Sequence, residues 1–254
     1  MNNFKIIGVT AENVAEAGIC CNKDKKSPGF KAKVEWFKMK INQGLKIGMA
    51  LDERDKLIGF IEYIPAEIAW RPVKADGYLF IHCIAVYAKE TRNKNLGSLL
   101  IQFCEADARQ NNKSGICAMS SNGAWIADKS VFEKNGFAVA DKLGRFELMC
   151  KKFDDKNPEP RFIDWTKNQS KYQGWNLIYS DQCPWHEKSV TDLKQAAHDN
   201  GIVLKVIKLE TPEEARNAPS GFGTFSLVYN GQLLEDHYLS KTRFENILKQ
   251  QNAK

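Results

Sequence analysis

Residues 92–100 read RNKNLGSLL, a short basic loop that runs into an apolar, periodic segment. Leucines and other apolar residues recur from Leu96 to Phe103 at intervals of three and four residues, which predicts a helix. The first turn of a helix exposes unpaired N–H groups and the positive end of the helix dipole, so it can hold a phosphate group. Gly97 would let the backbone approach such a ligand closely. Taken alone, the same pattern also fits a capped helix start with no ligand.

The elements around this loop follow one another in an informative order. An apolar run at residues 78–86, YLFIHCIAV, predicts a central strand before the loop. Further on, a helix is predicted over residues 124–135, and Gly136 suits its C-cap. With IAVYAKETRNKNLGSLLIQFCEADAR at residues 84–109 and VFEKNGF at residues 131–137, this order resembles the GNAT acetyltransferases.

The signature of that family is Arg/Gln-x-x-Gly-x-Gly/Ala, and Arg92, Asn95 and Gly97 stand at its three fixed places. The resemblance covers about residues 1–152 and implies acetyl-CoA as the cofactor. It implies that loop N–H groups hold the pyrophosphate, while the preceding strand splays from its neighbour and pairs with the pantetheine arm. The cofactor-binding residues implied in this way are Ile84, Val86, Arg92, Asn93, Lys94, Asn95, Leu96, Gly97, Ser98 and Asn122.

Asn95 departs from the family pattern, which has a glycine at this place. Asparagine is the non-glycine residue that best tolerates a positive φ. We therefore expect Asn95 to have a positive φ and the loop to keep its conformation.

Acetyl transfer to an amine needs a base, because an ammonium group cannot attack. Two titratable residues lie in otherwise apolar predicted strands, Glu62 in GFIEYIP and His82 in LFIHCIAV. His82 has the strand parity of Ile84 and Val86, so we expect its side chain to face the acetyl group. The alternatives are a solvated Glu62 near a strand end and a hydrogen-bonded core histidine.

The general acid of many GNAT enzymes is a tyrosine four residues before the glycine of the "GF" motif. Phe132 stands there in this chain and has no proton to give, so Tyr63 or a water molecule would have to replace it. Trp70 and Arg71 lie between predicted strands, and they either shape an acceptor pocket or pack their own loop.

Residues 153–171 are polar, contain two prolines and show little periodicity, so we place a linker there. The expected domains are an acetyltransferase domain over residues 1–152 and a second α/β domain over residues 172–254. In the second domain, Cys183-Pro184-Trp185-His186 follows a predicted strand and opens a predicted helix, whose N-terminus favours a thiolate.

This arrangement resembles the thioredoxin fold, with two departures. His186 occupies the place of the second cysteine, so an intramolecular disulfide of that type cannot form and only monothiol exchange remains. Gly223 stands where thioredoxins carry a cis-proline. The alternative is a degenerate fold that serves for docking. Together, the two halves resemble YoaP-type proteins, which are acetyltransferase domains fused to a thioredoxin-like tail.

The predicted fold class is therefore α/β (α+β): a mixed, mostly antiparallel GNAT sheet with flanking helices, followed by a small thioredoxin-like α/β domain. The leading hypothesis is an acetyl-CoA-dependent N-acetyltransferase for a small-molecule or peptide amine. One alternative is a thiol-dependent redox or CoA-sensing protein that works through Cys183, and another is a binding module without turnover. The candidate catalytic residues are Glu62, His82 and Cys183.

Composition also limits the possible partners, location and metal sites of the protein. The chain has 254 residues and a net charge of +6, but its charges are interspersed, which argues against a nucleic-acid partner. It lacks a long apolar run and a signal-peptide layout, so we expect no membrane partner and a cytoplasmic location. Seven irregularly spaced cysteines argue against a disulfide framework, and the Cys20-Cys21 pair has no partners at zinc-ligand spacing, so no metal site is expected. The oligomeric state stays open.

Overall fold

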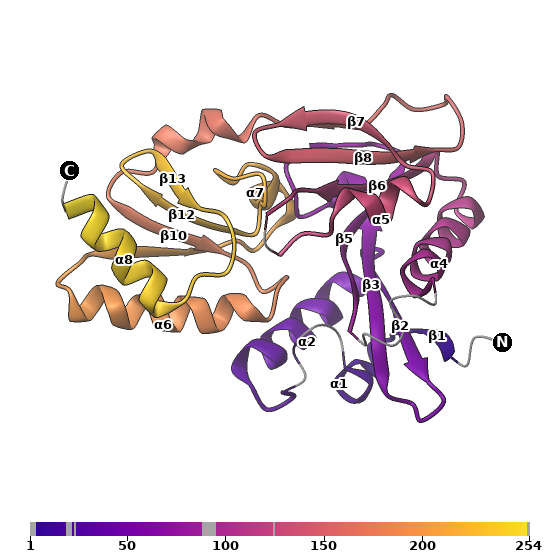
Figure 1. Ribbon diagram of the computed structural model, residues 1–254, viewed down its shortest axis with the longest axis horizontal. Helices are drawn as coiled ribbons and strands as arrows, with labels where there is room; N and C mark the ends of the chain where they lie inside the picture. The colour runs from indigo at the N-terminus through magenta and orange to yellow at the C-terminus, as the bar shows by residue number, and fades with distance from the viewer. Residues whose placement is uncertain (1–3, 19–21, 23, 88–94, 124, 253–254) are drawn as a thin grey trace. The chain divides into compact units, whose positions relative to one another are not determined.

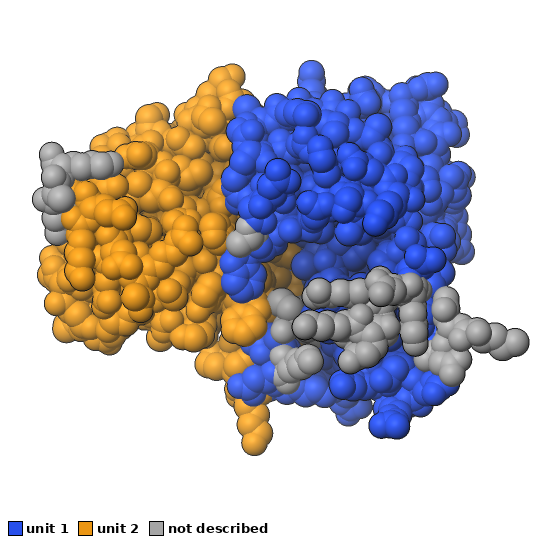
Figure 2. All heavy atoms as spheres, in the orientation of Figure 1, with its two compact units in different colours: residues 1–25, 34–69, 73–163 blue, residues 26–33, 70–72, 164–254 orange. Residues whose placement is uncertain are grey.

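The computed structural model describes residues 4–18, 22, 24–87, 95–123 and 125–252. The chain divides into two compact units (Figure 2). The first comprises residues 1–25, 34–69 and 73–163, and the second comprises residues 26–33, 70–72 and 164–254. The last division, between Ile163 and Asp164, lies inside the segment that the sequence marks as a linker.

The first unit is built on a seven-stranded sheet with the order β1-β2-β3-β5-β6-β8-β7 (Figure 1). Every neighbouring pair in it is antiparallel except β5 and β6, which are parallel. This is the mixed, mostly antiparallel sheet expected from the sequence. The strands are β1 (Phe4–Gly8), β2 (Lys46–Asp52), β3 (Leu57–Pro65), β5 (Tyr78–Val86), β6 (Gly115–Ser120), β7 (Ala138–Leu143) and β8 (Phe146–Lys152).

Helices flank this sheet. Helix α4 (Leu96–Gln110) packs against β2, β3, β5 and β6, because its apolar positions recur on one face. That face buries Leu96, Leu100, Ile101, Cys104 and Ala108 in the main core cluster. The other elements are α1 (Val14–Ala17), α2 (Pro28–Ile41), the 3₁₀ turn η1 (Ala66–Ile68) and α5 (Lys129–Glu133), and residues 28–33 of α2 are counted with the second unit.

Helix α5 is shorter than the sequence predicts, and the helix expected over residues 124–135 is wrong in its first turn. The side chain of Asp128 accepts a hydrogen bond from the N–H of Ser130 and so caps the helix at its observed start. Trp125 has a φ of 69°, which is incompatible with a right-handed helix.

The first unit also contains a two-stranded antiparallel ribbon, in which β4 (Val73–Lys74) pairs with β9 (Arg161–Phe162). The N–H of Phe162 also donates a hydrogen bond of 2.8 Å to Oδ2 of Asp141 in β7. Val73 is fully buried and Phe162 nearly so, and this burial fixes the ribbon to the first unit.

The second unit has a four-stranded sheet with the order β11-β10-β12-β13. Strand β10 is parallel to β11, as expected when a helix connects them, and antiparallel to β12, which forms an antiparallel hairpin with β13. Its elements are η2 (Trp165–Lys171), β10 (Trp175–Tyr179), α6 (Trp185–Asp199), β11 (Leu204–Lys208), α7 (Pro212–Arg216), β12 (Phe225–Tyr229), β13 (Gln232–Glu235) and α8 (Lys241–Asn252). Across the part of the chain that the structure describes, no helix combines the length and apolar character needed to cross a bilayer.

Candidate active site

The start of α4 has the conformation that its sequence predicts. Asn95 is the N-cap residue and lies in the left-handed region, with φ 56° and ψ 20°, so the expected positive φ is confirmed. Asn95 is exposed, Gly97 and Ser98 are half-buried, and Leu96 turns its side chain into the core. Three of the expected phosphate-loop residues lie outside the described residues: Arg92, Asn93 and Lys94.

Among the described residues, nothing packs tightly against Gly97. Within that part of the chain, a Cβ built on Gly97 would come near Cγ1 of Val131 alone, at an ordinary 3.9 Å. Gly59 in β3 differs, since a Cβ there would lie 2.8 Å from the carbonyl oxygen of Ala85. Packing therefore explains the glycine at position 59 but not the one at position 97. Free space beside the first turn of a helix of 15 residues suits the pyrophosphate of a cofactor.

Strand β5 leaves its parallel neighbour halfway along. The pairing with β6 ends at Ile81 and Ala118, whereas the pairing with β3 continues to Val86. Exposure changes at the same point: residues 78–82 are buried, and residues 83–86 are half-buried. Among the described residues, the edge of β5 that bears Ile84 and Val86 thus has no strand partner on the β6 side, which agrees with the splay expected from the sequence.

Glu62 in β3 contacts His82 in β5 at the point where β5 parts from β6. Oε1 of Glu62 lies 3.3 Å from Nδ1 of His82, and their side chains are 1% and 0% exposed. The register of β3 and β5 shifts between Glu62 and Tyr63, so His82 is an extra residue in its strand. The structure thereby excludes a solvated Glu62 and joins two residues that the sequence could only name separately.

The same bulge corrects the expected orientation of His82. Ile81 and Ile84 both pack against the core cluster under α4, although they are three residues apart. His82 instead contacts Glu62 and the ring of Phe80, neither of which belongs to that cluster. The prediction that His82 shares a face with Ile84 and Val86 is therefore wrong, because an inserted residue reverses strand parity.

Phe132, at the place of the usual acid, and Tyr63, the candidate to replace it, both lie in the core. Phe132 is 1% exposed and packs against Phe137 within the core cluster. Tyr63 lies in the same cluster, and burial raises the pKa of its hydroxyl, with further contributions from Cys104 and Asp107. Asn122, which follows β6, is exposed.

In the second unit, Cys183 is half-buried just before α6, and its carbonyl accepts a hydrogen bond from the N–H of His186. The imidazole of His186 is 1% exposed and lies against Phe222 and Phe225. Burial, with smaller contributions from the charges of Arg71 and Lys33, lowers the pKa of His186 to about 3. His186 is therefore neutral at pH 7, and its Nδ1–H donates to the carbonyl oxygen of Ser180 at 2.9 Å.

Arg71 belongs to the second unit and is 4% exposed. Its guanidinium donates to Oγ1 of Thr224 at 3.2 Å and to Oε1 of Gln182 at 3.5 Å, and it lies over the ring of Phe222. Of the two roles open from the sequence, Arg71 and the fully buried Trp70 take the packing role. The guanidinium of Arg71, hydrogen-bonded to Gln182 next to Cys183, is a feature that no sequence pattern indicated.

Gly223 has a φ of 73°, and a Cβ built on it would lie 2.9 Å from the carbonyl oxygen of Trp70. Glycine at this place is thus required by backbone conformation and by the close approach of a second backbone segment. The Cys20-Cys21 pair lies outside the described residues. Among the residues that are described, no group of three or more His, Cys, Asp or Glu side chains is placed to hold a metal ion.

Known proteins resemble both parts of the chain. The Acetyltransferase (GNAT) family matches residues 17–137, and a YoaP-like family matches residues 204–246. YncA from Salmonella typhimurium, solved with its cofactor acetyl-CoA, is 16% identical and covers 62% of this chain and 98% of its own, with a TM-score of 0.44. A GNAT-family acetyltransferase from Brucella melitensis, in complex with acetyl-CoA, is 13% identical and covers 63% of this chain and 94% of its own, with a TM-score of 0.39.

A relative from Bacillus subtilis (strain 168), the N-acetyltransferase YoaP by name, is similar along almost the whole sequence. It is 30% identical over 248 residues, which are 95% of this chain and 97% of the relative. Since the likeness extends across both parts and both family matches agree with it, the chain belongs to the YoaP family of GNAT acetyltransferases.

Proposed function

We propose that this protein transfers an acetyl group from acetyl-CoA to the amine of a small molecule or peptide. The observation that carries the proposal is the buried pair of Glu62 and His82 at the point where β5 leaves β6. Acetyl-CoA, when bound, supplies the acyl group as a reactive thioester.

The residues that would hold it are those at the start of α4 and along the unpaired edge of β5. N–H groups from Asn95 to Ser98 point along the positive end of the α4 dipole, and the free space at Gly97 gives room for the pyrophosphate. The open edge at Ile84 and Val86 would take the amide groups of the pantetheine arm. The proposed contributions of Arg92, Asn93, Lys94 and Asn122 rest on the sequence resemblance alone.

His82 acts as the base in this proposal. With its Nδ1–H donating to Glu62, the neutral ring carries its lone pair on Nε2, which is therefore the nitrogen that accepts a proton. Nε2 takes a proton from the acceptor ammonium, directly or through a water molecule, and so makes the nitrogen nucleophilic. Glu62 holds the ring in this tautomer and stabilises the imidazolium that forms, which makes it a positioning residue.

No acid is assigned to the departing thiolate. A thiolate leaves at neutral pH without protonation far more readily than an amine does, and both Phe132 and Tyr63 pack in the core. The absence of the usual tyrosine at position 132 is compatible with turnover on this account.

The experiment is a thiol-release assay with acetyl-CoA and a panel of polyamines, amino acids and peptides. We expect free CoA to appear with at least one amine, and His82→Gln to reduce kcat by about 10²-fold or more, as loss of a general base does. His198→Gln is the matched control, because His198 is an exposed histidine in the second unit. Equal activity in His82→Gln would overturn the role of His82, and no release with any amine would overturn transferase activity.

A second function is favoured by the surroundings of Cys183, and we propose that the second unit is a thioredoxin-like domain with monothiol activity. The parallel pair β10 and β11 with α6 between them, and the hairpin of β12 and β13, support the fold. The N-terminus of α6 and the Arg71 guanidinium on Gln182 both favour a thiolate at Cys183.

Alkylation with iodoacetamide as a function of pH tests this second function. Half-maximal reactivity of Cys183 well below pH 8.5, the value of an unperturbed thiol, would support it. Arg71→Met should then shift the curve to higher pH, whereas Arg243→Met, at an exposed arginine of the same unit, should not. A curve centred at pH 8.5 or above would contradict a role for Cys183 in thiol exchange.

A further inference from the structure

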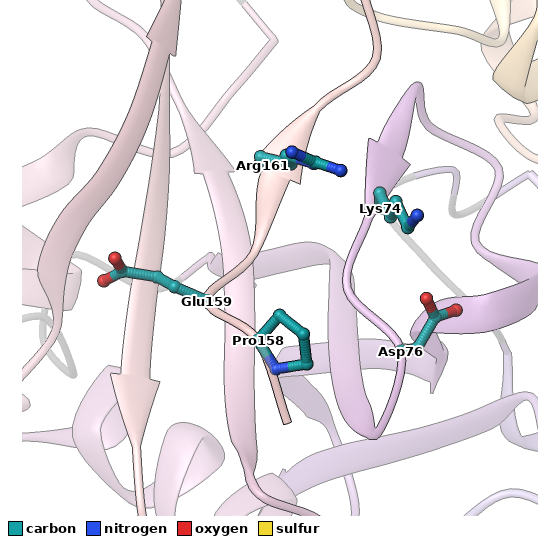
Figure 3. A pocket seen from close by; sticks show the side chains of 5 residues that line it. All are labelled: Lys74, Asp76, Pro158, Glu159 and Arg161. Carbon is teal, nitrogen blue, oxygen red and sulfur yellow. The ribbon is translucent and has the colours of Figure 1, made fainter. Parts of the chain in front are cut away.

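A pocket of about 170 Å³ lies in the first unit beside the β4–β9 ribbon (Figure 3). It is lined by Lys74, Asp76, Pro158, Glu159 and Arg161. At about 30 Å³ for each water molecule, it has room for roughly six waters, so a ligand that fills it would be small.

Two like charges face each other across the ribbon that forms this pocket. Lys74 and Arg161 are direct cross-strand partners in the antiparallel register of β4 and β9. Their neighbours in the same strands, Val73 and Phe162, are buried and hold the ribbon in place. Like charges directly opposite one another destabilise a strand pair, so Lys74 and Arg161 do not stabilise the pairing of β4 with β9.

The charged groups of the pocket do not neutralise one another. Within the described part of the chain, the side chains of Lys74, Asp76, Glu159 and Arg161 form no ion pair and no hydrogen bond with another side chain. Lysines elsewhere in the same unit do find carboxylates, as Lys5 does with Asp55 at 2.8 Å. Figure 3 shows the guanidinium of Arg161 extending toward the strand of Lys74, while the carboxylate of Glu159 turns to the other side.

We propose that this pocket binds a small molecule through an oxyanion, a carboxylate or phosphate group, held between Lys74 and Arg161. The planar guanidinium of Arg161 matches two oxygens of such a group, and the ammonium of Lys74 adds a point charge. Asp76, whose carboxylate lies on the Lys74 side in Figure 3, accepts a hydrogen bond from a hydroxyl or amine elsewhere on the same ligand.

The pocket is separate from the acetyl-transfer site. Strand β5 begins at Tyr78, directly after the Asp76 turn, and parts from β6 only after Ile81. His82, the proposed base, lies four residues from the start of the strand, a span of roughly 13 Å at about 3.3 Å per residue. The proposed ligand therefore binds apart from the reacting groups, and the proposal does not depend on the transferase reaction.

The test is an NMR titration of the full ¹⁵N-labelled chain at low ionic strength with sodium phosphate and, in parallel, sodium malonate. We expect saturable amide shifts confined to the pocket segments, residues 74–76 and 159–162, with sodium chloride giving none. Saturation by only one of the two anions would identify the group that the site selects. Shifts that grow linearly and equally with all three salts would overturn the proposal.

Variants at the two cations make the test specific. Arg161→Gln and Lys74→Gln should each raise the half-saturating anion concentration tenfold or more. Lys5→Gln, at the exposed, ion-paired lysine of β1, should leave it unchanged. Without ligand, Lys74→Gln should keep or raise the unfolding temperature, because it relieves the repulsion across the ribbon. Unchanged affinity in Arg161→Gln, or a clear fall in unfolding temperature in Lys74→Gln, would show that the cations serve the fold and would overturn the site.

Discussion

Oε1 of Glu62 and Nδ1 of His82 lie 3.3 Å apart in side chains that are almost completely buried. The pair sits at a β-bulge, and His82 is the first residue of β5 beyond its last partner in β6. A bulge re-aims the side chains beside it, and bulges are frequent next to active sites. We propose that the carboxylate of Glu62 and the imidazole of His82 act together in catalysis.

Glu62→Gln tests that role. The amide keeps a carbonyl acceptor for Nδ1–H but removes the negative charge, so we expect the ring to stay in place and kcat to fall by about tenfold, less than for His82→Gln. The acidic limb of the pH–rate profile should move to lower pH, because the imidazolium loses the carboxylate that stabilises it. An unchanged profile together with a lower unfolding temperature would mean that Glu62 only packs the core.

Gly97→Glu separates ligand binding from stability. Among the described residues, a Cβ at this position meets nothing closer than Val131 at 3.9 Å, and a carboxylate suits the first turn of a helix, so the substitution should leave stability equal or raise it by up to about 1 kcal/mol. The same carboxylate would repel the pyrophosphate, so acetyl-CoA affinity should fall tenfold or more, whereas Gly97→Ala, which the family signature admits, should keep it. Calorimetric titration and thermal unfolding of one preparation measure both effects. A loss of stability without a loss of affinity would reverse this account of Gly97.

Asn95→Gly examines the neighbouring residue. Asn95 has a φ of 56°, a conformation that glycine adopts without steric cost. The start of α4 should therefore keep its conformation, and acetyl-CoA affinity should stay equal or improve. A large loss of affinity would mean that the asparagine side chain itself contacts the cofactor.

His186 makes the stability of the second unit pH-dependent. Burial lowers its pKa in the folded state to about 3, from the ordinary value of 6.5. Between these values the unfolded chain binds more protons than the folded one, so stability is fully present above pH 6.5 and is lost as the pH falls toward 3. From pH 7 to pH 5 the contribution of this one group is about 2 kcal/mol.

Urea unfolding at pH 7 and pH 5 measures that loss. His186→Gln should be less stable at pH 7, because it loses packing against Phe222 and Phe225, but its stability should change less between the two pH values. The exposed His198 gives the control variant His198→Gln, which should keep the pH dependence of the unaltered protein. An identical pH dependence in His186→Gln would contradict a neutral, buried His186.

Local chemistry made part of this structure predictable. The order of strands and helices follows from hydrophobic periodicity, and the left-handed Asn95 follows from the restricted set of residues that tolerate positive φ. The strand β5 and the helix α4 that follows it lie where the sequence places them, because both have a strongly apolar face.

Features that depend on tertiary contacts were not predictable. The bulge between β3 and β5 inserts one residue, and a single residue reverses the face on which His82 lies. The late start of α5, at Lys129, follows from the positive φ of Trp125, which its side chain does not favour. Arg71 contacts Gln182 and Thr224 over separations of 111 and 153 residues, and no local pattern encodes such contacts.

The central claim is that acetyl-CoA binds at the start of α4 and along the open edge of β5. Isothermal titration of the full chain with acetyl-CoA, compared with Gly97→Glu, tests it most directly. We predict one saturable site in the intact protein and at least tenfold weaker binding in the variant, whose fold is unchanged. No heat of binding at millimolar acetyl-CoA, or equal affinity in the two proteins, would contradict the account.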